Sequence, residues 1–416
     1  MASNPARQFK HLSTQCKIGY ATVALFLVLW LLYTITTAIA YGTEMWWFSY
    51  FSVDYRLGFV RRGLAGEMLD LFPADHYFTG AWTLRCLVSA LFVIGLTGVA
   101  WTVAVNGGRS ERRLMLALLT PVLPFGFATA INGPHTDLLA ATALAMFAVI
   151  IASAKAPRRI VVASASYGAV TAFLAFIHEA GPLLYSLGAV LAIVVLSAHS
   201  PIRVQRLSAL LAVAPGLIVV LAVALIGRRG ISSQLCALVP HKALNWPAAG
   251  NLSTDQVMRG QRFYVDYHDW VCRNIIDKLD QTPIDAAKYV ASFGAVALIG
   301  SIALGIAIFA ATIFSISSIS GVPFGRFGRV LHSQILLVTL SAMLLLPIFA
   351  TTTDWTRWWV KISFDVGIVY LLYASGQREA SEPPTRLTRV LFAVGIVLFA
   401  AVPLGGIPNV GMPAPV

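Results

Sequence analysis

Acidic and basic side chains of the kind that bind phosphate lie together early in the chain. Asp54 is followed by three arginines, Arg56, Arg61 and Arg62. If 54–70 forms a helix, Asp54 and Arg61 lie two turns apart on nearly one face. Guanidinium groups match phosphate oxygens through paired donors, so this pattern favours a phosphate ligand. An amphipathic helix in the membrane interface, with its arginines among lipid head groups, explains the pattern equally well.

Three glycines interrupt this segment and lower its helix propensity. They are Gly58, Gly63 and Gly66. A residue without a Cβ lets the backbone come close to another helix or to a ligand, and we expect that use here.

Four further pairs of ionisable side chains occur near the expected ends of apolar stretches or in a long polar segment. They are His135 and Asp137, His178 and Glu179, Asp354 and Arg357, and Asp266 and His268. Taken singly, each pair is typical of a helix cap or a solvated turn. The spacing of Asp354 and Arg357 predicts a local ion pair. The pair at 178–179 lies in a short turn near the hydrocarbon boundary, where ionisable groups are costly unless paired or functional. We therefore predict supporting roles for all four pairs.

Metal ligands and cysteines are scarce in this sequence. The pairs at 135–137 and 178–179 offer nitrogen and oxygen atoms to a divalent cation, but such short spacings do not specify a metal. No metal site is assigned, and a divalent cation stays an optional cofactor. Cys236 and Cys272 share one predicted outer segment and could form a disulfide there. The sequence holds no Walker motif, GxSxG, HExxH or glycine-rich dinucleotide fingerprint, so ATP-driven pumping and the common soluble chemistries have no support.

The elements that must position these residues are apolar helices. Of the 416 residues, 58% are hydrophobic and 12% are charged, whereas a soluble chain is about 45–50% apolar and 25% charged. This composition excludes an ordinary cytosolic enzyme and a disordered chain. It predicts an all-α polytopic membrane protein, a single transmembrane domain over 1–416, because a bilayer-crossing helix needs about 20 apolar residues. The eleven predicted spans are 19–41, 84–105, 114–131, 138–153, 160–177, 181–198, 207–226, 290–314, 334–350, 359–374 and 390–406.

The lysines and arginines divide unevenly between the two sides of the membrane. With the N-terminus in the cytoplasm and the C-terminus outside, the inside segments carry 16 of the 30 bases but only three of the 18 acids. Such an excess is typical of cytoplasmic loops. The net charge of +12 therefore sets the topology against anionic membrane lipid and predicts no nucleic-acid partner. We expect a multi-pass protein of the bacterial plasma membrane.

Two predicted outer segments are longer than a connection requires. One is 42–83, which contains the expected interfacial helix, and the other is 227–289, between spans seven and eight. Every candidate acid, base and arginine lies on this extracytoplasmic side, and charges in the middle of spans are expected to be nearly absent. Chemistry is therefore predicted at the outer face.

This layout resembles the GT-C superfamily, polytopic glycosyltransferases that use polyprenyl-phosphate-linked sugars at the outer face of the membrane. The resemblance covers roughly residues 1–314 and rests on the cytoplasmic start, the first outer loop with Asp54 and the loop after span seven. It implies that Asp54 is the general base on the acceptor hydroxyl. It also implies that the three arginines of that loop, with His178, hold the lipid phosphate. Many members carry two adjacent acids in this loop, whereas Asp54 stands alone.

The resemblance implies an inverting glycosyltransferase that moves a sugar from a polyprenyl-phosphate donor to a cell-envelope glycan or glycolipid acceptor. Three short stretches, V-D-Y-R-L-G-F-V-R-R-G-L, H-E and D-W-T-R-W, also resemble uncharacterised bacterial envelope membrane proteins. Three other functions stay open. They are an envelope polysaccharide polymerase or ligase, a transporter or flippase for a lipid-linked substrate, and a structural membrane subunit. A transporter would favour ionisable groups within spans and pseudo-symmetric halves.

Overall fold

The computed structural model describes residues 14–41, 44–105, 108, 110–133, 135–247 and 249–401. Within these ranges the chain is mostly helical, and its only strands, β1 (Ala243–Asn245) and β2 (Tyr264–Asp266), form one antiparallel pair. Six helical stretches are long and apolar enough to cross a membrane: Thr14–Ala40, Ala74–Val105, Glu111–Asn132, Ile202–Ile226, Gly294–Ser320 and Phe324–Thr351. The prediction of a helical, multi-pass membrane protein is confirmed, and the count of eleven spans and their orientation stay predictions.

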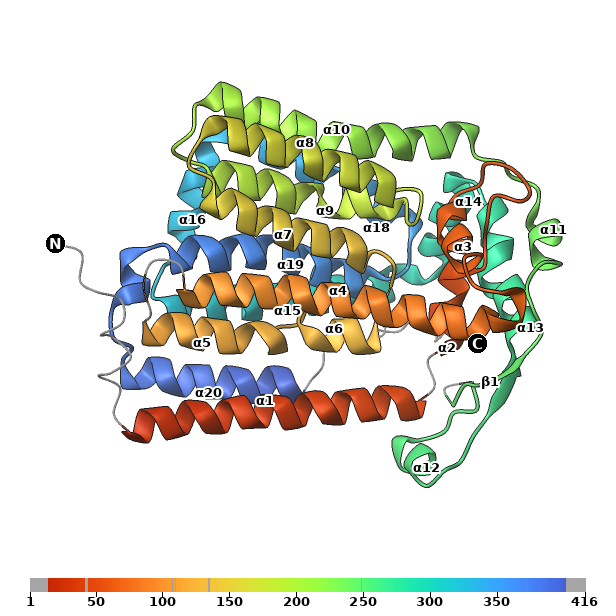
Figure 1. Ribbon diagram of the computed structural model, residues 1–416, viewed down its shortest axis with the longest axis horizontal. Coiled ribbons are helices and arrows are strands. Elements are labelled where there is room, and N and C mark those ends of the chain that lie inside the picture. The colour runs from red at the N-terminus through yellow and green to blue at the C-terminus, as the bar shows by residue number, and fades with distance from the viewer. Residues whose placement is uncertain are drawn as a thin grey trace.

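The helices that form the bundle, several of them long, lie side by side (Figure 1). They are α1 (Thr14–Tyr41), α4 (Tyr77–Val105), α5 (Glu111–Leu119), α6 (Phe127–Asn132), α7 (Leu138–Ser153), α8 (Pro157–Leu174), α9 (Ala180–Leu191) with η5 (Ala192–Leu196), α10 (Ile202–Ile226), α15 (Gly294–Ser320), α16 (Phe324–Leu331), α17 (Ile335–Met343), α18 (Leu346–Thr351), α19 (Trp355–Ser375) and α20 (Arg386–Ala401). Shorter elements form the first loop: α2 (Glu44–Phe48), η2 (Ser49–Phe51), α3 (Gly63–Leu69) and η3 (Ala74–His76). Others form the second: α11 (Ser232–Cys236), α12 (Thr254–Met258), α13 (Tyr267–Val271), η6 (Cys272–Ile276), η7 (Asp277–Asp280) and α14 (Pro283–Ser292).

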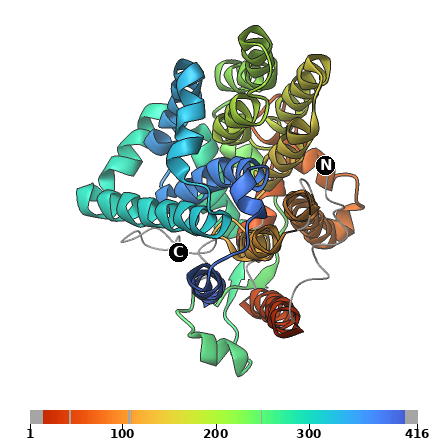
Figure 2. The ribbon, with the colours of Figure 1, turned by 90° about the vertical axis from the view of Figure 1, so that its left-hand side faces the viewer.

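Helix α19 forms the core of the bundle. It packs against α15, α9, α7 and α4, and most of its side chains are buried. Figure 2 shows the bundle along its axis, with helices on all sides of this centre. An ionisable side chain on α19 is therefore held inside the protein rather than exposed to lipid.

Helices α1 and α20 lie beside each other, where the Trp30 indole donates to the carbonyl of Ala400 over 2.9 Å.

Two predicted spans each consist of two helices. The apolar stretch 114–131 is divided between α5 and α6, and 334–350 between α17 and α18. Pro121 follows α5, and Pro347 stands in the first turn of α18. Proline lacks the backbone N–H and clashes with the preceding turn, which favours a break in the helix at these positions.

The expected helix over 54–70 is wrong for its first half, because α3 begins only at Gly63. Gly58 and Arg62 have positive φ angles of 104° and 66°, which interrupt a right-handed helix. The expected close approach is confirmed at Gly66. Its N–H donates to the carbonyl of Val53 over 3.0 Å, and a Cβ there would lie 2.2 Å from that oxygen.

The two ends of the bundle differ in composition. The first loop, the second loop and the short turns before α7 and α9 lie at one end, on the right in Figure 1; we call this the loop end. The arginine-rich starts of α5, α8, α10, α16 and α20 lie at the opposite end, the basic end. In the second loop, Cys236 and Cys272 form the disulfide that the sequence left open, and it ties α11 to η6.

Candidate functional site

A largely buried polar cluster lies at the loop end, where five parts of the chain meet. η2, the residue before α3, the turns before α7 and α9, and the start of α19 each contribute ionisable groups. We call the following set the polar cluster: Tyr50, Arg62, His135, Asp137, His178, Glu179, Asp354, Arg357 and Lys361. Charges buried in this way are costly unless they are paired or functional.

The first loop joins the polar cluster through Arg62. Its guanidinium forms a two-pronged contact with Glu179, with Nε–Oε2 at 2.9 Å and Nη2–Oε1 at 3.0 Å. Burial alone would raise the pKa of the Glu179 carboxyl, but the surrounding positive charge, that of Arg62 first, and the Arg62 hydrogen bonds together outweigh burial and hold that pKa well below its usual range. Arg62 takes the left-handed backbone conformation (φ 66°). A non-glycine residue in this strained conformation is typical of active sites and ligand-binding sites, where the surrounding structure holds it in place.

Arg357 connects three members of the polar cluster. Its guanidinium contacts Asp354 Oδ2 at 2.7 Å, so the predicted local ion pair is confirmed. It also donates to His135 Nε2 over 2.8 Å, and the other ring nitrogen of His135 contacts the Tyr50 hydroxyl. The same Arg357 nitrogen also lies 3.1 Å from His135 Nδ1. Because a guanidinium can only donate, at least one ring nitrogen of His135 accepts, so the imidazole is neutral here.

Lys361 and Asp137 form the most deeply buried pair. The two side chains are 4% and 1% exposed, and Nζ lies 3.4 Å from Oδ1. The other carboxylate oxygen of Asp137 has no hydrogen-bond partner among the described residues. One turn further along α19, Asp365 is also completely buried. The expectation that spans carry almost no charges is therefore wrong for α19, and the sequence signal was present, because Lys361 and Asp365 interrupt the apolar stretch 359–374.

The three arginines of the first loop do not gather around Asp54. Asp54 is 4% exposed and binds Arg56, whose backbone N–H and Nε each donate over 2.8 Å. Arg62 instead contacts Glu179, and Arg61 Nη2 donates to the carbonyl of Lys278 over 2.5 Å. Among the described residues no carboxylate forms an ion pair with Arg61. Of the predicted supporting pairs, Asp266 and His268 lie in the second loop beside His241, in a group of their own.

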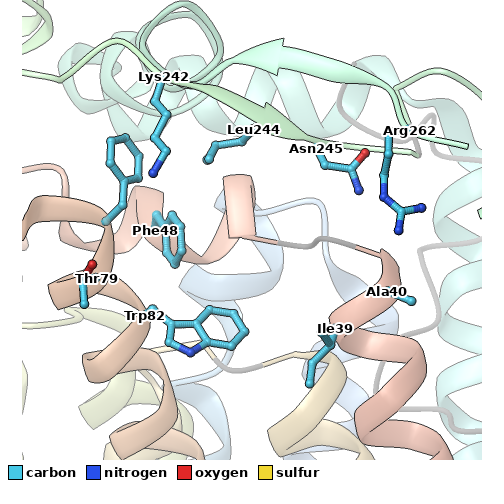
Figure 3. A pocket seen from close by; sticks show the side chains of 10 residues that line it. Ile39, Ala40, Phe48, Thr79, Trp82, Lys242, Leu244, Asn245 and Arg262 are labelled. Atoms are coloured by element: carbon cyan, nitrogen blue, oxygen red, sulfur yellow. The ribbon is translucent and has the colours of Figure 1, made fainter. Parts of the chain in front are cut away.

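A pocket of about 480 Å³ lies beneath the β1–β2 hairpin. Figure 3 shows Lys242, Asn245 and Arg262 on the hairpin side, facing Phe48 and Trp82 on the helices. The segment that supplies Phe48 also supplies Trp47 and Tyr50, whose rings lie 4.7 and 5.2 Å from the His135 ring between centroids. The short segment 47–50 therefore lies between the pocket and the polar cluster.

We expect the stability of the protein to depend on pH through His178. Burial, together with the nearby Arg62 guanidinium, lowers the pKa of His178 to about 4. His178 of the unfolded chain is protonated below about pH 6.5, whereas His178 of the folded protein stays neutral there. The free energy of unfolding therefore falls as the pH drops below about 6.5. The contribution of His178 to this slope is at most about 1.4 kcal/mol per pH unit.

Chemical unfolding in detergent between pH 5 and 7 measures this slope. The His178→Asn variant should lose the His178 share of the slope and keep the share of His135, because burial also lowers the pKa of His135 well below its usual value. His76→Asn is the control, because the His76 side chain is 56% exposed and should leave the slope unchanged. An equal slope in wild type and His178→Asn would contradict the prediction.

Together the fold and the polar cluster define a multi-pass helical membrane protein with ionisable groups gathered at one end of its bundle. The chain belongs to the family described as uncharacterised membrane protein Rv1490, whose model matches residues 20–400. It is 40% identical over 397 residues to the uncharacterized proteins Rv1490 of Mycobacterium tuberculosis and Mb1527 of Mycobacterium bovis, covering 94% of this chain and 91% of each relative. No solved structure matches the chain significantly. These descriptions name no activity, so the resemblance to GT-C enzymes stays a prediction.

Proposed function

We propose that this protein is a membrane glycosyltransferase that moves a sugar from a polyprenyl-phosphate donor to a cell-envelope glycan or glycolipid. The observation that carries the proposal is the polar cluster next to the pocket under the hairpin, both at the loop end. The arginines of the basic end favour an orientation with that end in the cytoplasm. The loop end then lies at the extracytoplasmic face of a bacterial plasma membrane.

The pocket has the chemistry that a lipid phosphate requires. Lys242 and Arg262 offer positive charge from the hairpin, and Asn245 offers an amide. The opposite wall is apolar and aromatic, with Phe48 and Trp82. A phosphate held by the two cations would leave its isoprenoid tail against the apolar helices, and the aromatic rings suit the face of a sugar.

The transfer needs one proton acceptor. The acceptor hydroxyl oxygen forms a bond to the anomeric carbon, the bond from that carbon to the phosphate oxygen breaks, and polyprenyl phosphate leaves with the electron pair. The hydroxyl proton passes to a carboxylate. We assign this role to Asp137 rather than to Asp54, because one Asp137 oxygen has no hydrogen-bond partner in the described part of the chain, whereas both Asp54 oxygens accept from Arg56. Since Asp137 is 1% exposed, the proposal requires the segment between the pocket and the polar cluster to move when the acceptor binds. The positive charges of Arg357 and Lys361, in the same cluster, would stabilise negative charge during the step.

The test uses purified protein in lipid nanodiscs with a panel of synthetic polyprenyl-phosphate sugars labelled in the sugar. A mycobacterial glycolipid extract serves as acceptor, and labelled products are separated by chromatography and identified by mass spectrometry. Wild type should form a labelled product, and Asp137→Asn should form it about 10²–10⁴-fold more slowly. Binding of the labelled donor and monodisperse elution show that the variant is folded.

Two further variants distinguish the assignments. Asp255→Asn changes an exposed acid that pairs with Arg259 in the second loop and should transfer at the wild-type rate. Loss of transfer in Asp54→Asn with retention in Asp137→Asn would return the role of base to Asp54. Absence of product with every donor, in a protein that binds the labelled donor, would contradict the glycosyltransferase proposal.

Transport of a lipid-linked substrate is the second candidate, favoured by Lys361, Asp137 and Asp365. Buried ionisable groups on a bundle helix are typical of substrate pathways in transporters. Movement of a fluorescent polyprenyl-phosphate sugar across proteoliposome membranes, without formation of a new glycoside, would select this function over the first.

A further inference from the structure

Four metal-ligating side chains come together in the second loop, away from the polar cluster. They are His241, Asp266, His268 and Asp269, and each has a ligand atom within 4.8 Å of those of the others. His241 Nδ1 lies 3.2 Å from Asp266 Oδ1, and His268 Nδ1 lies 3.1 Å from Asp269 Oδ1. The two imidazole rings are stacked, with centroids 3.9 Å apart. Both rings therefore present the same nitrogen beside a carboxylate.

These separations suit a tetrahedral ion. A Zn²⁺ ion binds histidine nitrogen and aspartate oxygen at about 2.0–2.1 Å, which places neighbouring ligands of a tetrahedron about 3.3 Å apart. The two nitrogen–oxygen distances above are close to that value, and rotation of the exposed His241 and Asp269 side chains can close the others. Two neutral imidazoles and two carboxylates would also balance the charge of a divalent ion.

The scaffold around these residues is fixed by several bonds. β1 pairs with β2 so that Ala243 faces Asp266, and the N–H of Tyr267 donates to the carbonyl of Lys242 over 2.8 Å. The disulfide between Cys236 and Cys272 ties the flanking helices together. The ligands on both sides of the hairpin are therefore held near one another before any ion binds.

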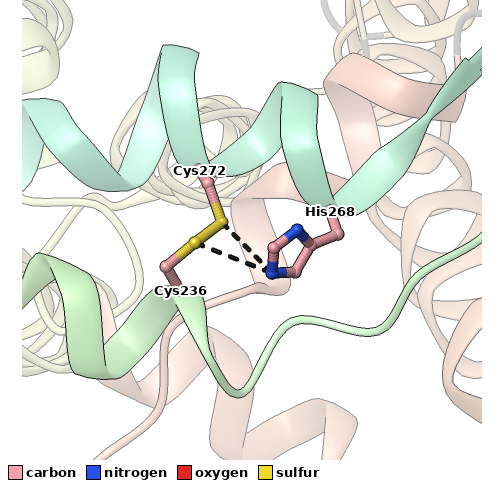
Figure 4. Close-up of side chains that lie close together, drawn as sticks. All are labelled: Cys236, His268 and Cys272. Carbon is pink, nitrogen blue, oxygen red and sulfur yellow. Dashed lines mark hydrogen bonds between the residues drawn. A yellow bond between two sulfur atoms is a disulfide. The ribbon is translucent and has the colours of Figure 1, made fainter.

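The orientation of His268 leaves the relevant nitrogen available. Figure 4 shows its ring beside the disulfide, with Nε2 directed at both sulfur atoms, at 3.7 and 3.8 Å. The second ring nitrogen lies on the opposite side of the ring, toward Asp269. If Nε2 carries the proton, Nδ1 has a lone pair facing a carboxylate, and a cation between the two relieves their repulsion.

We propose that His241, Asp266, His268 and Asp269 form a site for a divalent transition-metal ion, Zn²⁺ by the chemistry of its ligands. Four protein ligands leave no open position, so the ion acts structurally. The ion would fix the start of the hairpin. Lys242, the residue after His241, lines the pocket, and its Nζ lies 4.5 Å from the centre of the Phe78 ring. This metal site does not depend on the proposed glycosyltransferase reaction.

The test measures metal binding by the full chain in detergent, after removal of any affinity tag and treatment with a chelator. Titration with Zn²⁺ against a competing indicator should show one tight equivalent in wild type, and Co²⁺ should give the absorption of a tetrahedral complex. His241→Ala and Asp269→Asn should each weaken Zn²⁺ binding at least about 10-fold. Both residues are exposed, so these variants should fold.

The pair His76 and Asp75 provides a matched control, because its atoms lie 3.0 Å apart and no third ligand from the described ranges joins them. His76→Ala should leave the binding of Zn²⁺ unchanged. As a second readout, Zn²⁺ should raise the melting temperature of wild type and not that of His241→Ala, because an ion that binds only the folded state stabilises it. Less than one equivalent in wild type, or equal affinity in wild type and His241→Ala, would overturn the proposal.

Discussion

Replacing Lys361 by methionine is expected to lower the free energy of unfolding by about 3–5 kcal/mol. The substitution keeps the shape of the aliphatic stem but removes the charge that lies 3.4 Å from Asp137. The carboxylate then stays buried with neither oxygen in an ion pair with α19. Removal of one partner from a buried pair is costly because the other charge loses its compensation without regaining water. Unfolding in mixed micelles with increasing denaturing detergent measures the loss.

The double variant Lys361→Met/Asp137→Asn should recover most of that loss, because it removes both charges together. The exposed pair of Arg259 and Asp255, four residues apart on the loop surface, is the matched control. Arg259→Met should cost less than about 1 kcal/mol, because water solvates the remaining acid. A loss as small in Lys361→Met as in Arg259→Met would show that the buried pair contributes no stability.

Replacing Gly66 by alanine should destabilise the first loop by about 3 kcal/mol or more. A Cβ at this position would lie 2.2 Å from the carbonyl oxygen of Val53 and 2.9 Å from the amide nitrogen of Asp54. Both atoms belong to the backbone, so no side-chain rotation can remove the overlap. Helix α3, which follows Arg62, must then move away from the backbone of Val53 and Asp54. The contact between Arg62 and Glu179 should be lost as a result.

Gly325 is the control for this experiment. It lies in α16, where a Cβ would meet nothing within 4 Å. Gly325→Ala should stabilise the protein by about 0.5–1 kcal/mol, because alanine loses less backbone entropy in a helix. Both variants are compared by thermal unfolding and by proteolysis of the first loop. Equal stability of Gly66→Ala and wild type would contradict the close packing of α3.

Local patterns were enough to predict part of the candidate site. The spacing of Asp354 and Arg357 led to the correct ion pair, and the shared segment of Cys236 and Cys272 allowed a disulfide, which the structure contains. Both predictions depend on neighbours along the chain or on one loop. The helix over 54–62 was wrong because helical spacing ignores the positive φ angles that tertiary contacts impose on Gly58 and Arg62.

The partners of the buried charges could not be predicted in this way. Arg62 contacts Glu179, 117 residues away, and Lys361 contacts Asp137, 224 residues away. Many acids and bases in the chain could form such pairs equally well, and a difference in sequence position carries no information on which of them meet. The packing of α19 against α7 brings Lys361 to Asp137, and the contact of the first loop with the turn before α9 brings Arg62 to Glu179.

The sequence by itself determined that the chain forms apolar helices in a membrane, because burial of 58% hydrophobic residues in lipid needs no knowledge of their neighbours. It also determined where the excess of basic residues occurs along the chain. Tertiary structure alone decided which ionisable groups share the polar cluster and which, such as Asp54, bind elsewhere. The physical reason is that hydrophobicity is a property of each segment, whereas a buried charge is stable only beside a particular partner, and helix packing selects that partner.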